Sequence, residues 1–101
     1  MGFGNTILDL STAVLSCAGK EIRLSAKEFD ILRLLFQSGA GNLSKETILA
    51  RVWGYDSDAV ENHVEVYMGF LRKKLLSIGS NVRIEAIRRM GYHLEVAEHD
   101  S

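Results

Sequence analysis

The fold is decided by residues 60–75, which read VENHVEVYMGFLRKKL. Apolar side chains recur there every three or four residues, which is the spacing of one face of an α-helix. They are Val60, Val64, Met68, Leu71 and Leu75. We therefore expect a helix from Ala59 to about Leu76. Its opposite face, which we expect in solvent, carries Asn62, Val66, Gly69 and Lys73.

A second segment, IEAIRRMGYHL at residues 84–94, has the pattern of a β-hairpin. Apolar and polar side chains alternate over residues 82–86 and again over residues 92–96, so each run presents one face to a core. The two runs are separated by Arg88, Arg89, Met90 and Gly91. The sequence thus predicts a hairpin over residues 82–96 with a basic tip.

Two shorter helices are expected before the long one. Ser25 and Glu28 have the capping-box spacing, in which each side chain satisfies a backbone N–H of the other residue. Apolar residues at helical spacing follow, and Gly39 is expected to end this helix. Ser44 is the expected cap of a second helix, which ends at Trp53.

The expected fold class is α+β, in the order of a winged helix-turn-helix. Residues 7–24 alternate apolar and polar side chains and contain turn residues, which predicts a small N-terminal antiparallel sheet. Three helices follow over residues 25–76, with the helix-turn-helix in residues 44–76. The hairpin over residues 82–96 then forms the wing. We expect residues 1–101 to be a single domain, because a chain of this length builds one core.

The charge of the chain is nearly balanced but unevenly distributed. The net charge is −1, yet residues 62–93 carry six Lys or Arg against two Asp or Glu. Such a basic segment suits a nucleic-acid ligand, although it could equally be a solvated face. No run of apolar residues is long enough to cross a membrane, residues 1–5 do not resemble a signal peptide, and the single Cys17 fits a reducing compartment. We therefore expect a cytoplasmic protein.

The residue sets that catalysis or metal binding require are missing from the sequence. The histidines are His63, His93 and His99; Cys17 is far from them in the sequence, and no Cys-x-x-Cys spacing occurs. His93 and Glu95 share a strand face, where two solvated neighbours are the simpler interpretation. We expect no enzyme activity, no catalytic residue, no metal and no cofactor.

Four segments resemble OmpR/PhoB-type response regulators, the transcription factors of bacterial two-component systems. Residues 64–75 (VEVYMGFLRKKL) are similar to the recognition helix of that family, and residues 84–94 (IEAIRRMGYHL) to its wing. Upstream, LSAKEF at residues 24–29 and VWG at residues 52–54 resemble two further family motifs. The resemblance covers residues 7–96 in order and at the expected spacings.

The resemblance implies that the long helix enters the major groove of DNA and the wing tip enters the adjacent minor groove. Arg88 corresponds to a minor-groove arginine, and Tyr92 to a tyrosine that contacts phosphate. Further phosphate-contacting positions of the family correspond to Trp53, Asn62, His63 and Arg72. The helical wheel adds Lys73, and the reading face adds Tyr67, Gly69 and Phe70. Trp53 and Tyr92 have an alternative role as core residues.

The chain departs from the family pattern at several of these positions. Gly69 and Phe70 stand where relatives often carry long polar side chains. Gly69 offers only close backbone approach, and Phe70 could contact a thymine methyl or be partly buried. Ala86 replaces a threonine of the wing, which removes one hydroxyl contact to phosphate. Arg89 replaces a glycine; it could add a phosphate contact, but it must adopt the turn conformation that glycine usually supplies.

The function implied is that of a sequence-specific DNA-binding effector domain of a response regulator. In this family an N-terminal receiver domain, absent from this chain, is phosphorylated by a sensor kinase. The domain commonly binds direct repeats of double-stranded DNA in tandem, and it contacts RNA polymerase through the loop that corresponds to residues 53–58. We expect the isolated domain to be a monomer.

A second interpretation is a winged-helix protein-interaction module that does not bind DNA. An exposed patch of Val66, Gly69 and Phe70 could bind a protein partner, and the low net charge is compatible with this. The basic wing argues for DNA.

Overall fold

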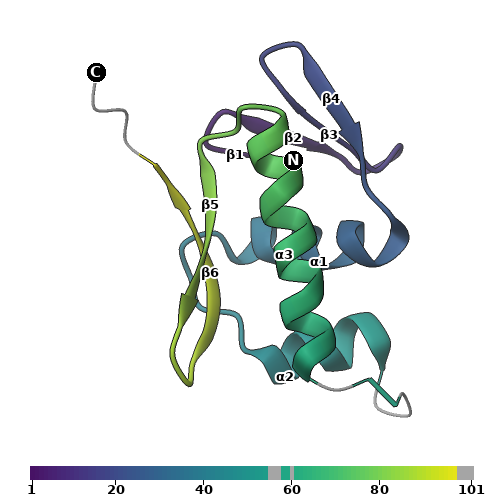
Figure 1. Cartoon of the computed structure of the whole chain (residues 1–101), viewed down its shortest axis with the longest axis vertical. Coiled ribbons are helices and arrows are strands. Elements are labelled where there is room, and N and C mark those ends of the chain that lie inside the picture. Colours follow the sequence, from purple (N-terminus) through teal and green to yellow (C-terminus); the bar gives the residue numbers. More distant parts are fainter. Residues whose placement is uncertain (55–57, 60, 98–101) are drawn as a thin grey trace.

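The computed structural model describes residues 1–54, 58–59 and 61–97 (Figure 1). A four-stranded antiparallel sheet comes first, with strands β1 (Gly2–Phe3), β2 (Thr6–Asp9), β3 (Val14–Cys17) and β4 (Lys20–Arg23) in sequence order. The helices α1 (Ala26–Ser38), α2 (Lys45–Ile48), η1 (Leu49–Trp53) and α3 (Glu61–Ser77) follow. The hairpin of β5 (Val82–Ile87) and β6 (Gly91–Val96) closes the order and lies beside α3 in Figure 1. The expected winged helix-turn-helix architecture is confirmed.

The N-terminal sheet is longer than the expected 7–24. Strand β1 pairs with β2, and Leu8 N–H donates to the Met1 carbonyl at 2.7 Å. The Phe3 ring packs against Phe36 of α1, with ring centroids 6.2 Å apart. A strand of two residues is too short to show an alternating pattern, which is why the sequence did not reveal it. Further along the sheet, Leu8 lies opposite Leu15, and both are fully buried.

Helix α1 begins and ends as its sequence predicts. The Ser25 hydroxyl accepts from the Glu28 N–H at 3.4 Å, and the Glu28 carboxylate accepts from the Ser25 N–H at 2.7 Å. The Gly39 N–H donates to the Leu35 carbonyl after the last turn. The capping box and the glycine stop are therefore both present, and they fix α1 directly after β4.

The second helix is not a uniform α-helix. Ser44 caps α2 by accepting from the Thr47 N–H, but after Ile48 the chain continues as the π-helical turn η1. The Gly54 N–H donates to the Leu49 carbonyl at 3.1 Å, five residues back. Over one turn, the apolar spacing does not distinguish α from π geometry, so the sequence predicted the end at Trp53 correctly and the turn type incorrectly.

Helix α3 supplies the centre of the core. It begins at Glu61, two residues after the expected start at Ala59, and Val60 lies outside the described residues. Its buried side chains are those of the expected stripe, namely Val64, Met68, Leu71 and Leu75. In Figure 1, α3 passes in front of α1. The opposite face of α3 therefore remains open to solvent.

Candidate nucleic-acid interface

The solvent face of α3 carries a strip with polar ends and an apolar middle. Asn62 and Lys73 are exposed near the two ends of the strip. Val66 and Phe70, in its middle, are 44% and 45% exposed. Gly69 lies between them, and a Cβ built on it would meet no heavy atom within 4 Å. The helical-wheel prediction of this face is confirmed. Among the described residues, no other helix or strand packs over this face of α3.

A row of aromatic rings leads from η1 to this strip. Trp53 packs edge-on against Tyr67 with ring centroids 5.6 Å apart, and Tyr67 packs edge-on against Phe70 at 5.4 Å. The His63 ring lies 6.2 Å from Trp53, and Lys27 Nζ lies 5.6 Å above the Trp53 ring. Edge-to-face pairs are favourable and restrict ring motion. Trp53 and Tyr67 are partly buried against the core, and Phe70 is the solvent-facing end of the row.

The wing tip presents two arginines. Arg88 and Arg89 are exposed, and neither has a hydrogen bond or ion pair to another described residue. Arg89 has φ +67°, so it adopts the left-handed conformation expected from its replacement of glycine. Gly91 has φ +128°, and a Cβ there would overlap the Leu43 backbone. This close approach explains the glycine at the start of β6.

The wing is attached to the connection between α1 and α2. Leu43 and Tyr92 form a backbone bridge, in which Leu43 N–H donates to the Tyr92 carbonyl at 2.7 Å and Tyr92 N–H donates to the Leu43 carbonyl at 2.9 Å. The Asn42 side-chain amide donates to the Met90 carbonyl at 2.7 Å. These bonds hold the tip at a fixed place beside the helices.

Arg72 binds the wing in the structure. Its Nε and Nη2 both donate to the Ile84 carbonyl of β5, at 3.1 and 2.8 Å. The resemblance had implied a phosphate contact for this residue, and that role stays a prediction. What the structure adds is that the guanidinium already bridges α3 and β5, so Arg72 orients the wing relative to the helix.

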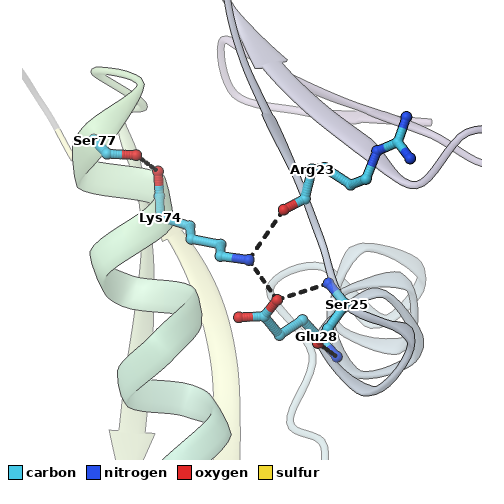
Figure 2. Close-up of polar contacts among 5 residues, drawn as sticks. All are labelled: Arg23, Ser25, Glu28, Lys74 and Ser77. Carbon is cyan, nitrogen blue, oxygen red and sulfur yellow. Dashed lines mark hydrogen bonds and ion pairs between the residues drawn. The ribbon is translucent and has the colours of Figure 1, made fainter.

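Some of the other cations in the basic segment, residues 62–93, are also bonded within the protein, and others are not. Lys74 Nζ donates to the Glu28 carboxylate at 2.5 Å and to the Arg23 carbonyl at 3.0 Å (Figure 2). Arg83 Nη1 donates to the Ser80 carbonyl at 2.9 Å. Lys73, by contrast, has no hydrogen bond or ion pair within the described part of the chain. Three of the six cations in residues 62–93, namely Arg72, Lys74 and Arg83, are thus hydrogen-bonded to other groups of the protein.

Tyr92 lies inside the angle between the wing and the helices. It is 4% exposed, and burial raises the pKa of its hydroxyl while the nearby Lys45 acts in the opposite direction. A cleft of about 350 Å³ opens beside it, lined by residues of the α2 and α3 N-termini and of the wing. The Lys45 ammonium and the Glu65 carboxylate form an ion pair of 2.9 Å in its wall. Sequence reasoning missed this pair, because the two residues belong to different helices.

His93 and Glu95 are not two solvated neighbours, as expected, but a hydrogen-bonded pair. His93 Nε2 lies 2.8 Å from Glu95 Oε1, and the His93 side chain is only 15% exposed. Glu95 itself is 57% exposed, so the pair lies at the protein surface, on the face of β6 opposite the buried Tyr92 and Leu94. His99 lies outside the described residues, as do residues 55–57 of the segment 53–58. In the part of the chain that is described, no three His, Cys, Asp or Glu side chains converge as a metal site, and no helix has the length and hydropathy to span a bilayer.

In sequence, the chain is similar to transcription regulators. The family model described as "Transcriptional regulatory protein, C terminal" matches residues 19–94. The transcriptional regulatory protein CiaR of Streptococcus pneumoniae is 36% identical over 93 residues, which are 92% of this chain and 42% of CiaR. The probable transcriptional regulatory protein TcrX of Mycobacterium tuberculosis is 37% identical over 94 residues, which are 93% of this chain and 40% of TcrX. The chain therefore spans less than half the length of these curated relatives.

Solved structures agree with the sequence comparison. The C-terminal domain of the nisin resistance regulator NsrR, a lantibiotic response regulator, has a TM-score of 0.76 at 36% identity over 92% of this chain and 93% of that one. The DNA-binding domain of Klebsiella pneumoniae RstA, solved in complex with the RstA box, has a TM-score of 0.78 at 28% identity over 98% and 97%. The matched family consists of transcription regulators and is not a class of enzymes. The chain belongs to this family, the winged helix-turn-helix C-terminal domains of OmpR/PhoB-type response regulators.

Proposed function

We propose that this domain controls transcription by binding duplex DNA sequence-specifically, with α3 in the major groove and the wing tip in the adjacent minor groove. The observation that carries the proposal is the pair of solvent-facing arginines, Arg88 and Arg89, at the tip of a wing fixed beside an uncovered helix. An α-helix fits the major groove, and an arginine suits a narrow minor groove with its strong negative potential.

Within this arrangement the candidate residues take different roles. Lys73 and Arg89 are placed to neutralise phosphates, and Arg88 is placed to enter the minor groove. Asn62 is exposed at the first turn of α3, where it can contact the backbone of the DNA. We also propose DNA contacts through the outer edges of four ring side chains, those of Trp53, His63, Tyr67 and Tyr92. Arg72 acts mainly by orienting the wing.

The activity of a longer protein is proposed by analogy with the family. A receiver domain, phosphorylated by a sensor kinase, would precede this domain in a cytoplasmic regulator. Two copies on a direct repeat would gain affinity through effective concentration, whereas the isolated domain, which we take to comprise residues 1–101, would be a weakly binding monomer. RNA polymerase would bind through residues 53–58. The proposal includes no enzyme activity, metal or cofactor.

Salt dependence of duplex binding tests the proposal. Three cations without internal partners, Lys73, Arg88 and Arg89, would release counterions, which gives a slope of about −3 in log Kobs against log salt concentration per domain. The measurement is fluorescence anisotropy with a duplex selected from a random pool by the wild-type domain. Failure to select any sequence, or a flat salt titration, would contradict the proposal.

Arg88→Ala separates groove insertion from simple charge. The variant should lose roughly 1–2 kcal/mol more binding free energy on a site with A·T-rich flanks than on one with G·C-rich flanks. Lys73→Ala is the matched control, since a residue that contacts only phosphate should weaken both duplexes equally. Equal losses for Arg88→Ala on both duplexes would make Arg88 a phosphate contact, and no loss on either would remove the wing from the interface.

A protein-interaction module remains the second candidate, because Val66 and Phe70 are almost half exposed in the middle of α3. This function requires no salt-dependent DNA binding. The titration described above therefore distinguishes the two candidates.

A further inference from the structure

The middle of the α3 solvent face is formed by Val66, Gly69 and Phe70, and none of these three has a side chain able to hydrogen-bond to a base. Val66 and Phe70 are separated by four residues, so they are neighbours on the helix surface, and they are 44% and 45% exposed. Gly69 beside them contributes only backbone, with open space around its Cβ position. The nearest carboxylate, on Glu65, is paired with Lys45 at 2.9 Å. This part of the helix is therefore apolar and uncharged.

We infer that Val66 and Phe70 read thymine through its C5-methyl group, the one apolar feature that base pairs display in the major groove. The inference rests on the proposed function, because it requires α3 to lie in that groove. It deepens the proposal by naming the specificity-determining residues and the base they select.

The dimensions of the strip support this assignment. From Asn62 to Lys73 the helix rises roughly 16 Å, whereas the major groove is about 12 Å wide. When α3 crosses the groove, its polar ends reach the phosphate rims and the segment between Val66 and Phe70 lies over base edges. The bare Gly69 backbone permits a closer approach than any other residue would.

Phe70 is also held in place before DNA arrives. Its ring packs edge-on against Tyr67 at 5.4 Å, and Tyr67 packs against Trp53 at 5.6 Å. A ring with restricted motion loses less conformational entropy when it binds, and it selects one geometry of the partner. A methyl group that docks on this ring would therefore be recognised by position as well as by hydrophobicity.

Replacement of thymine by uracil tests the inference, because uracil lacks only the methyl group and keeps every hydrogen-bonding atom. Each thymine in the selected duplex is replaced in turn, and the Kd of the wild-type domain is measured. A buried methyl is worth ~0.8 kcal/mol, so we expect about fourfold weaker binding at each position read. Phe70→Ala should weaken binding to the thymine duplex and abolish the difference between thymine and uracil.

Leu76→Ala is the matched control, because Leu76 is 63% exposed at the other end of α3 and should leave the thymine preference unchanged. Specific binding with equal affinity for thymine and uracil duplexes would overturn the inference and leave the proposed function standing. Failure to bind any duplex specifically would overturn both. Self-association of the wild-type domain in sedimentation, abolished by Phe70→Ala and without a uracil effect, would assign the strip to a second copy of the chain instead.

Discussion

Replacement of Lys74 by methionine should destabilise the domain by roughly 2–3 kcal/mol. Lys74 Nζ donates to the Glu28 carboxylate at 2.5 Å, and Glu28 is only 4% exposed (Figure 2). Methionine keeps most of the apolar stem but leaves this carboxylate buried without its cation. Removal of one partner of a buried pair costs about 3–5 kcal/mol. We expect less, because the Lys74 side chain is 27% exposed and Glu28 still accepts from the Ser25 N–H.

The assay is urea unfolding at pH 7, with melting temperature as a second measurement. For a domain of this size, each 1 kcal/mol lowers the melting temperature by about 4–8 °C, so the variant should melt roughly 10–20 °C lower. Lys73→Met is the control, since Lys73 is exposed and should change stability by less than about 0.5 kcal/mol. Equal unfolding midpoints for the two variants would refute the reasoning.

The pH dependence gives an independent check on the same pair. Burial raises the pKa of Glu28, but the hydrogen bonds from Lys74 and Ser25 outweigh it, and the pKa is lowered. A carboxyl group with a lowered folded-state pKa stabilises the fold above its unfolded pKa, and this contribution is lost as the pH falls through the folded-state value. The stability gap between wild type and Lys74→Met should therefore be complete at pH 7 and shrink below about pH 4.3. A gap that stays constant down to pH 3 would show that charge is not its origin.

Three further substitutions have defined outcomes. Gly69→Ala should raise the free energy of unfolding by about 1 kcal/mol in urea titration, because its Cβ meets no neighbour and alanine favours helix; a loss would contradict this. Gly91→Ala should lower the free energy of unfolding by roughly 3 kcal/mol, and with it the melting temperature, because the new Cβ would overlap the Leu43 backbone at a positive φ. An unchanged melting temperature would argue against this role. Arg89→Gly should stabilise the fold by about 1 kcal/mol while it reduces the magnitude of the DNA salt slope by about 0.9, and an unchanged slope would exclude Arg89 from the interface.

Elements whose signals are local could be predicted from the sequence. The α1 boundaries follow from Ser25, Glu28 and Gly39, each of which acts within one turn of the helix end. The wing follows from strict alternation on both sides of the Arg88–Met90 tip. In each case the backbone hydrogen bonds that define the element lie close together in the chain, so a short pattern contains the information.

Features that depend on long-range contact could not be predicted. Strand β1 is stabilised by Phe3 on Phe36, and the Lys45–Glu65 pair joins two helices. Among the site residues, the exposed face of α3 was predictable, because helical periodicity tells which side chains leave the core. Which backbone carbonyl faces a given cation depends on tertiary packing, and Arg72 therefore appeared equivalent to Lys73 in the sequence.

The run LRKKL at residues 71–75 shows why a cluster of cations is not by itself a DNA-binding patch. Successive residues of an α-helix point about 100° apart, so five consecutive side chains cover all sides of α3. Leu71 and Leu75 are buried in the core, Arg72 bonds to β5, and Lys74 bonds to Glu28 at the start of α1. Only Lys73 faces solvent without an internal partner among the described residues. The helix proposed to enter the groove is thus braced on both flanks by its own cations. Because the Arg72 brace joins α3 to β5 of the wing, the spacing between major-groove and minor-groove contacts depends on a residue that need not touch a base.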